Sequence, residues 1–268
     1  MIKVNDVYEY IKELAPLEMA NDDDNVGFLV GSSDTTVTKV LVCLDITGDV
    51  ISEALDIGAE MIIAHHPVFF SLEDVTDESI SGKKVVRMLA GGISAVCMHT
   101  NLDAVRGGVN DALALAVGIA DANREAELLS DERRLDSGEV VSLGRVGYLN
   151  KPCPITEYLE PLKKALGVNG LRYYDAGKDV YKIAISSGAG GGEWDNAVKS
   201  GCDTFITADI KYHMFLDAKE LGINIIDGGH YATENLVSDV LVDKLSTKFP
   251  TVETCLSKKQ NQVVEFFI

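Results

Sequence analysis

The chain has 268 residues, 46% of them hydrophobic, so it can bury one large core or two modest ones. Its 24 basic and 42 acidic residues give a net charge of −18. A surface this acidic repels nucleic acid and anionic membranes, so general binding to either is not expected.

The five cysteines are widely spaced and form no Cys-x-x-Cys pair. They predict neither a disulfide framework nor a zinc ribbon, which is typical of a reducing compartment. The N-terminal segment has an amphipathic pattern rather than that of a signal peptide. No apolar run approaches the roughly 18 residues that a membrane span requires. We therefore expect a cytoplasmic protein.

Helical and strand patterns alternate along the first 120 residues. In order they are a helix at 4–14, strands at 28–30 and 39–45, a helix at 49–57, a strand ending at His65-His66, a helix at 82–90, a strand at 93–98 and a helix at 108–117. Gly58 follows one helix as a suitable C-terminal cap. This alternation is typical of an α/β fold with largely parallel strands.

A second region begins near residue 121 with a charged segment. Its predicted elements are strands at 144–149, 170–174 and 181–185 and a helix at 155–166. We therefore expect a first α/β domain at 1–125 and a second at 126–268, with a C-terminal segment that can pack back on the first domain.

The sequence also contains an internal repeat. Residues 54–64 match 197–207, and residues 89–103 match 220–234, so that His99 corresponds to His230 and Asp103 to Glu234. The repeat predicts two related α/β half-domains with mixed, largely parallel sheets around a shared metal-binding cleft.

Histidines follow three of the apolar strands. His65-His66 ends the run 61–64 and precedes a proline, which stops the strand. His99 and His230 each follow a further apolar run, and each has a carboxylate four residues on. Imidazole and carboxylate together suit zinc, manganese, iron or nickel, so the pattern predicts a metal site.

The simplest metal site that would use these residues holds two divalent ions about 3.5–4 Å apart, bridged by one carboxylate. One ion would take His65, Asp103 and one oxygen of Glu234. The other would take His66, His230 and the second oxygen of Glu234. Each ion would keep positions for water, as catalytic rather than structural sites do.

Other residues have two interpretations each. His99 is either a ligand or a group that orients Asp103. His213 follows a strand of the second repeat and lies either at the cleft or on the ordinary surface. The glycine-rich turn at 188–192 is either a tight turn or a loop that faces a ligand. In the second case, phosphate would be contacted by Gly188, Gly190 and Gly191.

Several motifs along nearly the whole chain closely resemble the NIF-three-like family, also labelled GTP cyclohydrolase I type 2 homologues. They are Asp24–Gly27, Leu44–Thr47, Ala64–Pro67, His99–Asp103, Gly188–Gly190, Thr207–His213 and Gly229–Glu234. The chain departs from the family at Ala208, where relatives commonly have glycine. Some relatives also carry a domain inserted between the halves, for which 268 residues leave no room.

The resemblance implies a two-domain α/β protein with a dinuclear metal centre, assembled as a toroidal homohexamer. Zinc, manganese and iron are the expected ions. The family ligands fall on His65, His66, Asp103, His230 and Glu234.

The family label also suggests a reaction, GTP cyclohydrolysis, in which water attacks C8 of guanine and formate leaves. His99 or His213 would then transfer protons. A broader hydrolase that acts on nucleotides or phosphoesters is an equal expectation. The alternative is a non-enzymatic protein, either a metal-binding or metal-handling protein or a hexamer that binds a partner.

Overall fold

The computed structural model describes residues 1–130 and 133–267. The chain divides into two compact units. Unit 1 comprises Met1–Leu102 and Val237–Asn261, and unit 2 comprises Asp103–Leu236 and Gln262–Ile268. The boundary predicted near residue 125 lies inside unit 2, because the apolar side chains of the helix at 109–117 pack into the core of that unit.

The sheet of unit 1 has five strands. Their order is β1 (Gly27–Val30), β4 (Ser94–Cys97), β3 (Met61–Ala64), β2 (Lys39–Cys43) and β13 (Glu253–Leu256). β1 runs antiparallel to β4, and the other neighbouring strands are parallel. All four residues of β3 are buried, which explains its continuous apolar sequence.

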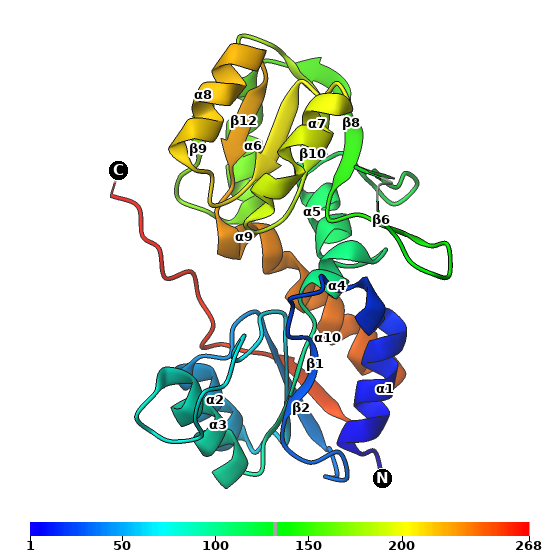
Figure 1. The fold of residues 1–268 in the computed structure, drawn as a ribbon, viewed down its shortest axis with the longest axis vertical. Coiled ribbons are helices and arrows are strands. Elements are labelled where there is room, and N and C mark those ends of the chain that lie inside the picture. The colour runs from blue at the N-terminus through cyan, green and yellow to red at the C-terminus, as the bar shows by residue number, and fades with distance from the viewer. Residues whose placement is uncertain (131–132, 268) are drawn as a thin grey trace. The chain divides into compact units, whose positions relative to one another are not determined.

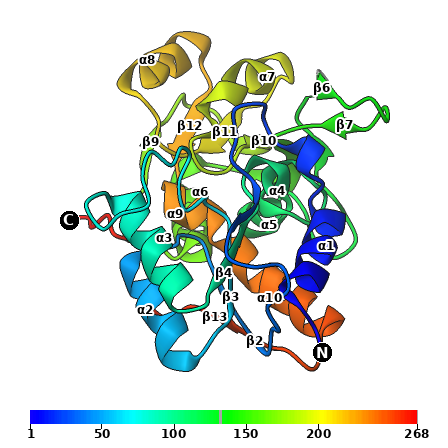
Figure 2. The same cartoon turned by 60° about the horizontal axis from the view of Figure 1, so that its bottom comes forward.

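Helices cover both faces of this sheet (Figures 1 and 2). On one face, α2 (Gly48–Ile57) and α3 (Ile80–Ala90) pack their apolar sides against the strands. On the other lie α1 (Val4–Leu14) and α10 (Leu236–Lys248). The buried residues of α1 are Val4, Val7 and Ile11, the spacing of an amphipathic helix.

The main sheet of unit 2 has six strands. Their order is β5 (Glu127–Leu128), β8 (Arg145–Cys153), β10 (Val180–Ile185), β11 (Thr204–Thr207), β12 (Asn224–Asp227) and β9 (Arg172–Tyr174). β10, β11 and β12 are parallel, while β8 and β9 pair with them in the antiparallel direction. A separate two-stranded pair consists of β6 (Arg133–Arg134) and β7 (Val140–Val141).

Unit 2 also has helices on both faces of its main sheet. α5 (Val109–Val117) and α6 (Ile155–Leu166) form one core with the strands. α7 (Trp194–Lys199) and α8 (Tyr212–Leu221) form the other, around Phe205. The protein is therefore a mixed α/β protein, as the alternating pattern predicts.

Corresponding elements follow one another in the same order in the two units. α1-β1-β2-α2-β3-α3-β4 is matched by α6-β9-β10-α7-β11-α8-β12. The strand order β1-β4-β3-β2 is likewise matched by β9-β12-β11-β10, with the same strand directions. A short helix then follows in each case, α4 (Thr100–Ala104) or α9 (His230–Glu234).

Local sequence signals predict several helix ends correctly. The helices expected at 4–14 and 155–166 have those limits in the structure. Gly58 ends α2 with a left-handed backbone (φ 69°), which glycine adopts without steric cost. Every helix in the described part of the chain is too short or too polar to cross a lipid bilayer.

Candidate metal centre

His65 and His66 lie in the backbone ladder just beyond the end of β3. The His65 N–H donates to the Cys43 carbonyl at 3.3 Å, and the His66 N–H donates to the Leu44 carbonyl at 2.9 Å. His65 is completely buried. These hydrogen bonds hold the backbone of both residues at the carboxyl end of the parallel strands, where α/β sheets commonly bind ligands.

His99 joins these two histidines within unit 1. Its ring centroid lies 5.3 Å from that of His65 and 5.6 Å from that of His66. One ring nitrogen from each of the three residues lies within 4.8 Å of the others. Three imidazoles this close together could hold a metal ion.

The Nδ1 atom of each of these rings lies 2.8 Å from an oxygen acceptor. The acceptors of His65, His66 and His99 are, in that order, the Met98 carbonyl, Asp45 Oδ1 and Asp24 Oδ1. Because a carbonyl or an ionised carboxylate only accepts, the proton of a neutral ring lies on Nδ1. Nε2 then carries the lone pair, as in histidines that bind metal.

Asp24 is a strongly held carboxylate. Burial by itself would raise its pKa, but hydrogen bonds with His99 and Thr100 outweigh that effect. The pKa of Asp24 is therefore held well below its usual range. Asp24 stays ionised at neutral pH and keeps the His99 ring in one orientation.

In unit 2, α9 presents His230 and Glu234 one helical turn apart. His230 Nε2 lies 3.1 Å from Glu234 Oε2, and Glu234 is almost completely buried. His230 Nδ1 lies 2.7 Å from Asp209 Oδ2, so this ring is also held by a carboxylate. The hydrogen bond to Glu234 is the main reason that the pKa of His230 is raised to about 9.

Asp103 lies near Glu234 in the same unit. An oxygen of each carboxylate lies within 4.8 Å of one of the other, and both residues are buried. The Ser187 hydroxyl donates to Asp103 Oδ1 at 3.1 Å. Two buried carboxylates this close repel each other when both are ionised, and a cation between them removes that cost.

The glycine-rich turn contacts this carboxylate pair. Gly188 has a left-handed backbone (φ 55°), and a Cβ atom at this position would lie 1.9 Å from Glu234 Oε1. Its N–H donates to Thr233 Oγ1 at 3.0 Å, and the Gly190 N–H donates to the Gly188 carbonyl at 2.8 Å. Phosphate contact by Gly188, Gly190 and Gly191 stays a prediction.

His213 is exposed in the first turn of α8, and its role in proton transfer also stays a prediction. Three carboxylates that hold histidine rings have no role in the predicted site: Asp24, Asp45 and Asp209. In the structure, Asp45 and Asp209 each stand two residues beyond the end of a strand, β2 or β11, as His66 does beyond β3.

The available donors fit a divalent metal. Neutral imidazole and carboxylate are borderline-to-hard ligands that suit zinc, manganese and iron. The three-imidazole group of unit 1 and the carboxylate pair with His230 in unit 2 each supply several such donors. The described residues thus define an α/β protein with histidine and carboxylate groups that could hold metal.

Comparison with known proteins places the chain in a family. The Duf34/NIF3 (NGG1p interacting factor 3) family description matches residues 2–262, and the chain belongs to this family. It is 35% identical over 268 residues to a protein of Clostridium perfringens named GTP cyclohydrolase 1 type 2 homolog, covering 99% of this chain and 100% of that one. A Lactococcus lactis protein of the same name is 34% identical over 249 residues, covering 91% of each chain.

Solved structures show the same fold. A hypothetical protein from Staphylococcus aureus superposes with a TM-score of 0.89 and 26% identity, over 99% of both chains. The structure of reduced HcgD from Methanocaldococcus jannaschii gives a TM-score of 0.80 and 27% identity, over 96% of this chain and 98% of that one.

Proposed function

We propose that the chain binds two divalent metal ions through a shared ligand set and acts as a metal-dependent hydrolase. The ligands are His65, His66, Asp103, His230 and Glu234. The observation that carries the proposal is the buried pair of carboxylates in unit 2, whose nearest oxygens lie within 4.8 Å. Such a pair is stable when a cation neutralises it.

The fixed histidine rings support the same proposal. The Nδ1 atoms of His66 and His230 are both held by carboxylates, at 2.8 and 2.7 Å. Acceptors of this kind fix the tautomer of ligating histidines and raise their basicity. Zinc, manganese and iron would all suit this donor set, and the Glu234 carboxylate could offer one oxygen to each ion.

The proposed reaction is hydrolysis of a nucleotide or phosphoester. A bound divalent ion acidifies water and supplies a nucleophile at neutral pH. His99 is the first candidate for proton transfer, which is supported by the contact of its Nδ1 atom with Asp24, because Nε2 is then left to exchange protons. His213 is a second candidate for proton transfer, and the turn at 188–191 is the candidate contact for phosphate.

The test compares the wild-type protein with Glu234→Gln after loading with zinc, manganese, iron or cobalt. Metal content and turnover of GTP, other nucleotides and phosphoesters are measured. We expect Glu234→Gln to lower metal content and abolish turnover, because it removes a negative charge from the proposed ligand set. Glu220→Gln is the matched control, since Glu220 is an exposed carboxylate of the same unit.

Turnover that survives Glu234→Gln undiminished would contradict a hydrolytic site built on this carboxylate. Firm metal binding by the wild type without turnover of any substrate would instead favour the non-enzymatic alternative, a metal-handling or partner-binding protein. Wild-type protein that binds none of the four metals would contradict both.

Three further features belong to the proposal. The matching order of elements supports two related half-domains that share the metal cleft. The family resemblance supports a toroidal homohexamer, for which light scattering should give about six times the 28.9 kDa chain mass. The five cysteines, all free, support a reducing compartment such as the cytoplasm.

A further inference from the structure

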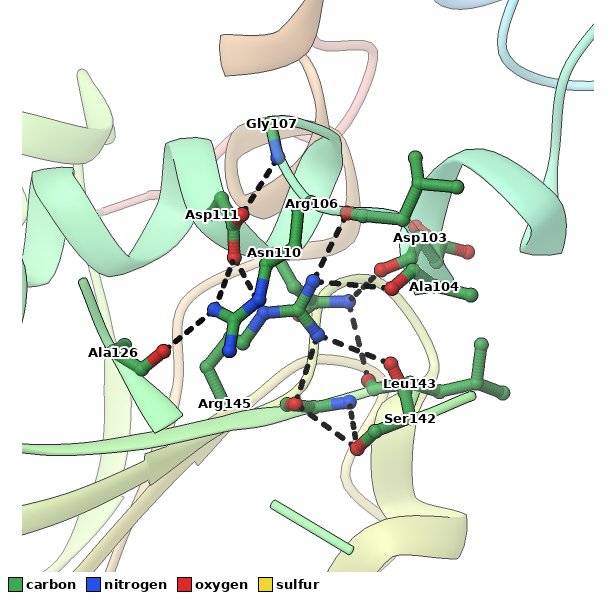
Figure 3. Close-up of polar contacts among 12 residues, drawn as sticks. Asp103, Ala104, Arg106, Gly107, Asn110, Asp111, Ala126, Ser142, Leu143 and Arg145 are labelled. Carbon is green, nitrogen blue, oxygen red and sulfur yellow. Dashed lines mark hydrogen bonds and ion pairs between the residues drawn. The ribbon is translucent and has the colours of Figure 1, made fainter. Parts of the chain in front are cut away.

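Arg145 at the start of β8 is completely buried and makes a full set of hydrogen bonds (Figure 3). Its Nε donates to Asp111 on α5. Nη1 donates to the carbonyls of Ser142 and Gly144 at 3.1 and 3.0 Å. Nη2 donates to the carbonyls of Ala104 and Val105 at 3.1 and 3.0 Å.

These contacts use all five N–H donors of the guanidinium group. Burying a cation carries a desolvation cost, which the Asp111 carboxylate and the four carbonyls offset. The planar fork of arginine therefore serves to fix these segments relative to one another.

One of the fixed segments begins at Asp103. The carbonyls of Ala104 and Val105 belong to the two residues that follow this carboxylate in the chain. The Asn110 side chain adds a second hold, because its Nδ2 donates to the Asp103 carbonyl at 3.1 Å and to the Leu143 carbonyl at 3.2 Å.

A third contact reaches the carboxylate itself. The Ser187 hydroxyl donates to Asp103 Oδ1 at 3.1 Å, while the Ser187 N–H donates to Asn110 Oδ1 at 2.9 Å. The backbone of Asp103, its carboxylate and the turn after β10 are thus joined in one hydrogen-bonded network, which lies entirely in unit 2.

We propose that Arg145 and Ser187 are positioning residues for the Asp103 carboxylate, and that they set the affinity and coordination geometry of the metal that it binds. Arg145 fixes the backbone that carries the carboxylate, and Ser187 fixes its direction. This inference rests on the proposed metal function and goes beyond it by naming residues outside the ligand set.

The test measures cobalt and zinc affinity, together with the visible spectrum of the cobalt-loaded full chain. Ser187→Ala and Arg145→Lys are each expected to weaken metal binding about ten- to hundredfold, as loss of a partner of a ligand does. The cobalt bands should also shift, because the direction of the Asp103 carboxylate changes. Ser187→Thr keeps the hydroxyl and should restore both readouts.

Ser186→Ala is the matched control. Ser186 is the neighbouring buried serine, and its hydroxyl donates to the Leu143 carbonyl rather than to Asp103. It should leave the cobalt spectrum unchanged. Should Arg145→Lys fail to fold, Ser187→Ala decides the question alone.

Wild-type affinity and an unshifted cobalt spectrum in folded Ser187→Ala would overturn the inference while leaving the metal function in place. Wild-type protein that binds no metal would overturn the proposed function and this inference with it. The two failures are distinguishable because only the second is a loss of metal binding in the wild-type protein.

Discussion

The backbone of Gly188 lies directly against the carboxylate of Glu234. A Cβ atom at residue 188 would come 1.9 Å from Glu234 Oε1 and 3.2 Å from His230 Nε2. The turn after β10 thus needs glycine for two reasons, a left-handed backbone and the space that the carboxylate occupies. Glu234 can occupy its position only because residue 188 has no Cβ atom.

Gly188→Ala should therefore displace Glu234 and weaken metal binding. The left-handed backbone alone should cost about 1–2 kcal/mol of folding stability. Metal affinity by calorimetry and the free energy of unfolding in urea are the measurements. Gly192→Ala is the control, since nothing lies within 4 Å of a Cβ atom at that residue. Equal metal affinity in the two variants would contradict the role assigned to Gly188.

Asp45→Ala should weaken metal binding without removing a ligand. Asp45 Oδ1 lies 2.8 Å from His66 Nδ1, and its loss frees the ring to rotate and to change tautomer. We expect about a tenfold weaker affinity for zinc, within the range seen for partners of ligating histidines. Asp56→Ala removes an exposed carboxylate from α2 and should have no effect on affinity. If both variants bind zinc equally well, the hydrogen bond between Asp45 and His66 does not affect zinc affinity.

The stability of the metal-free protein should fall as pH rises from about 6.5 to about 9. The pKa of His230 is raised from 6.5 to about 9 in the folded state, chiefly by Glu234. The folded state then binds more protons than the unfolded state in this window, so stability is full below it and is lost above it. Thermal unfolding of chelator-treated protein measures the effect.

Glu234→Gln removes the main cause of the shift in the pKa of His230. The melting temperature of this variant should therefore depend less on pH in the same window. The same decline in the variant and the wild type would assign the effect to other groups.

A fragment of residues 1–125 should not fold into a stable unit. It lacks α10, which covers one face of the first sheet, and β13, which pairs with β2. We expect binding of a hydrophobic dye and a broad thermal transition, compared with a sharp transition for the fragment 1–261. A cooperative transition in the fragment 1–125 would show that the segment 237–261 is dispensable.

Local elements were predictable because their signals are local. The periodicity of α1 and the glycine after α2 lie within a few residues of the helices that they define. The same holds for the histidines at strand ends, whose common position in parallel strands brings His65, His66 and His99 together.

Long-range contacts were not predictable in this way. Asp24 is 75 residues from His99, and Ser187 is 84 residues from Asp103, so no periodic pattern connects either pair. The burial of Arg145 is a further example, because charged residues usually lie at the surface and only the surrounding carbonyls make this position tolerable.

The parallel pairing of β2 with β13 has a consequence for the order in which the protein is made. Lys39 is synthesised well before Glu253, the residue with which it pairs. All six strands of the main sheet of unit 2 have been synthesised by Asp227, before β13 exists. The later-synthesised unit can thus complete its sheet while the earlier one still exposes the edge of β2. During that interval a nascent chain can pair with other chains through β2, and β13 covers this edge once it has been made.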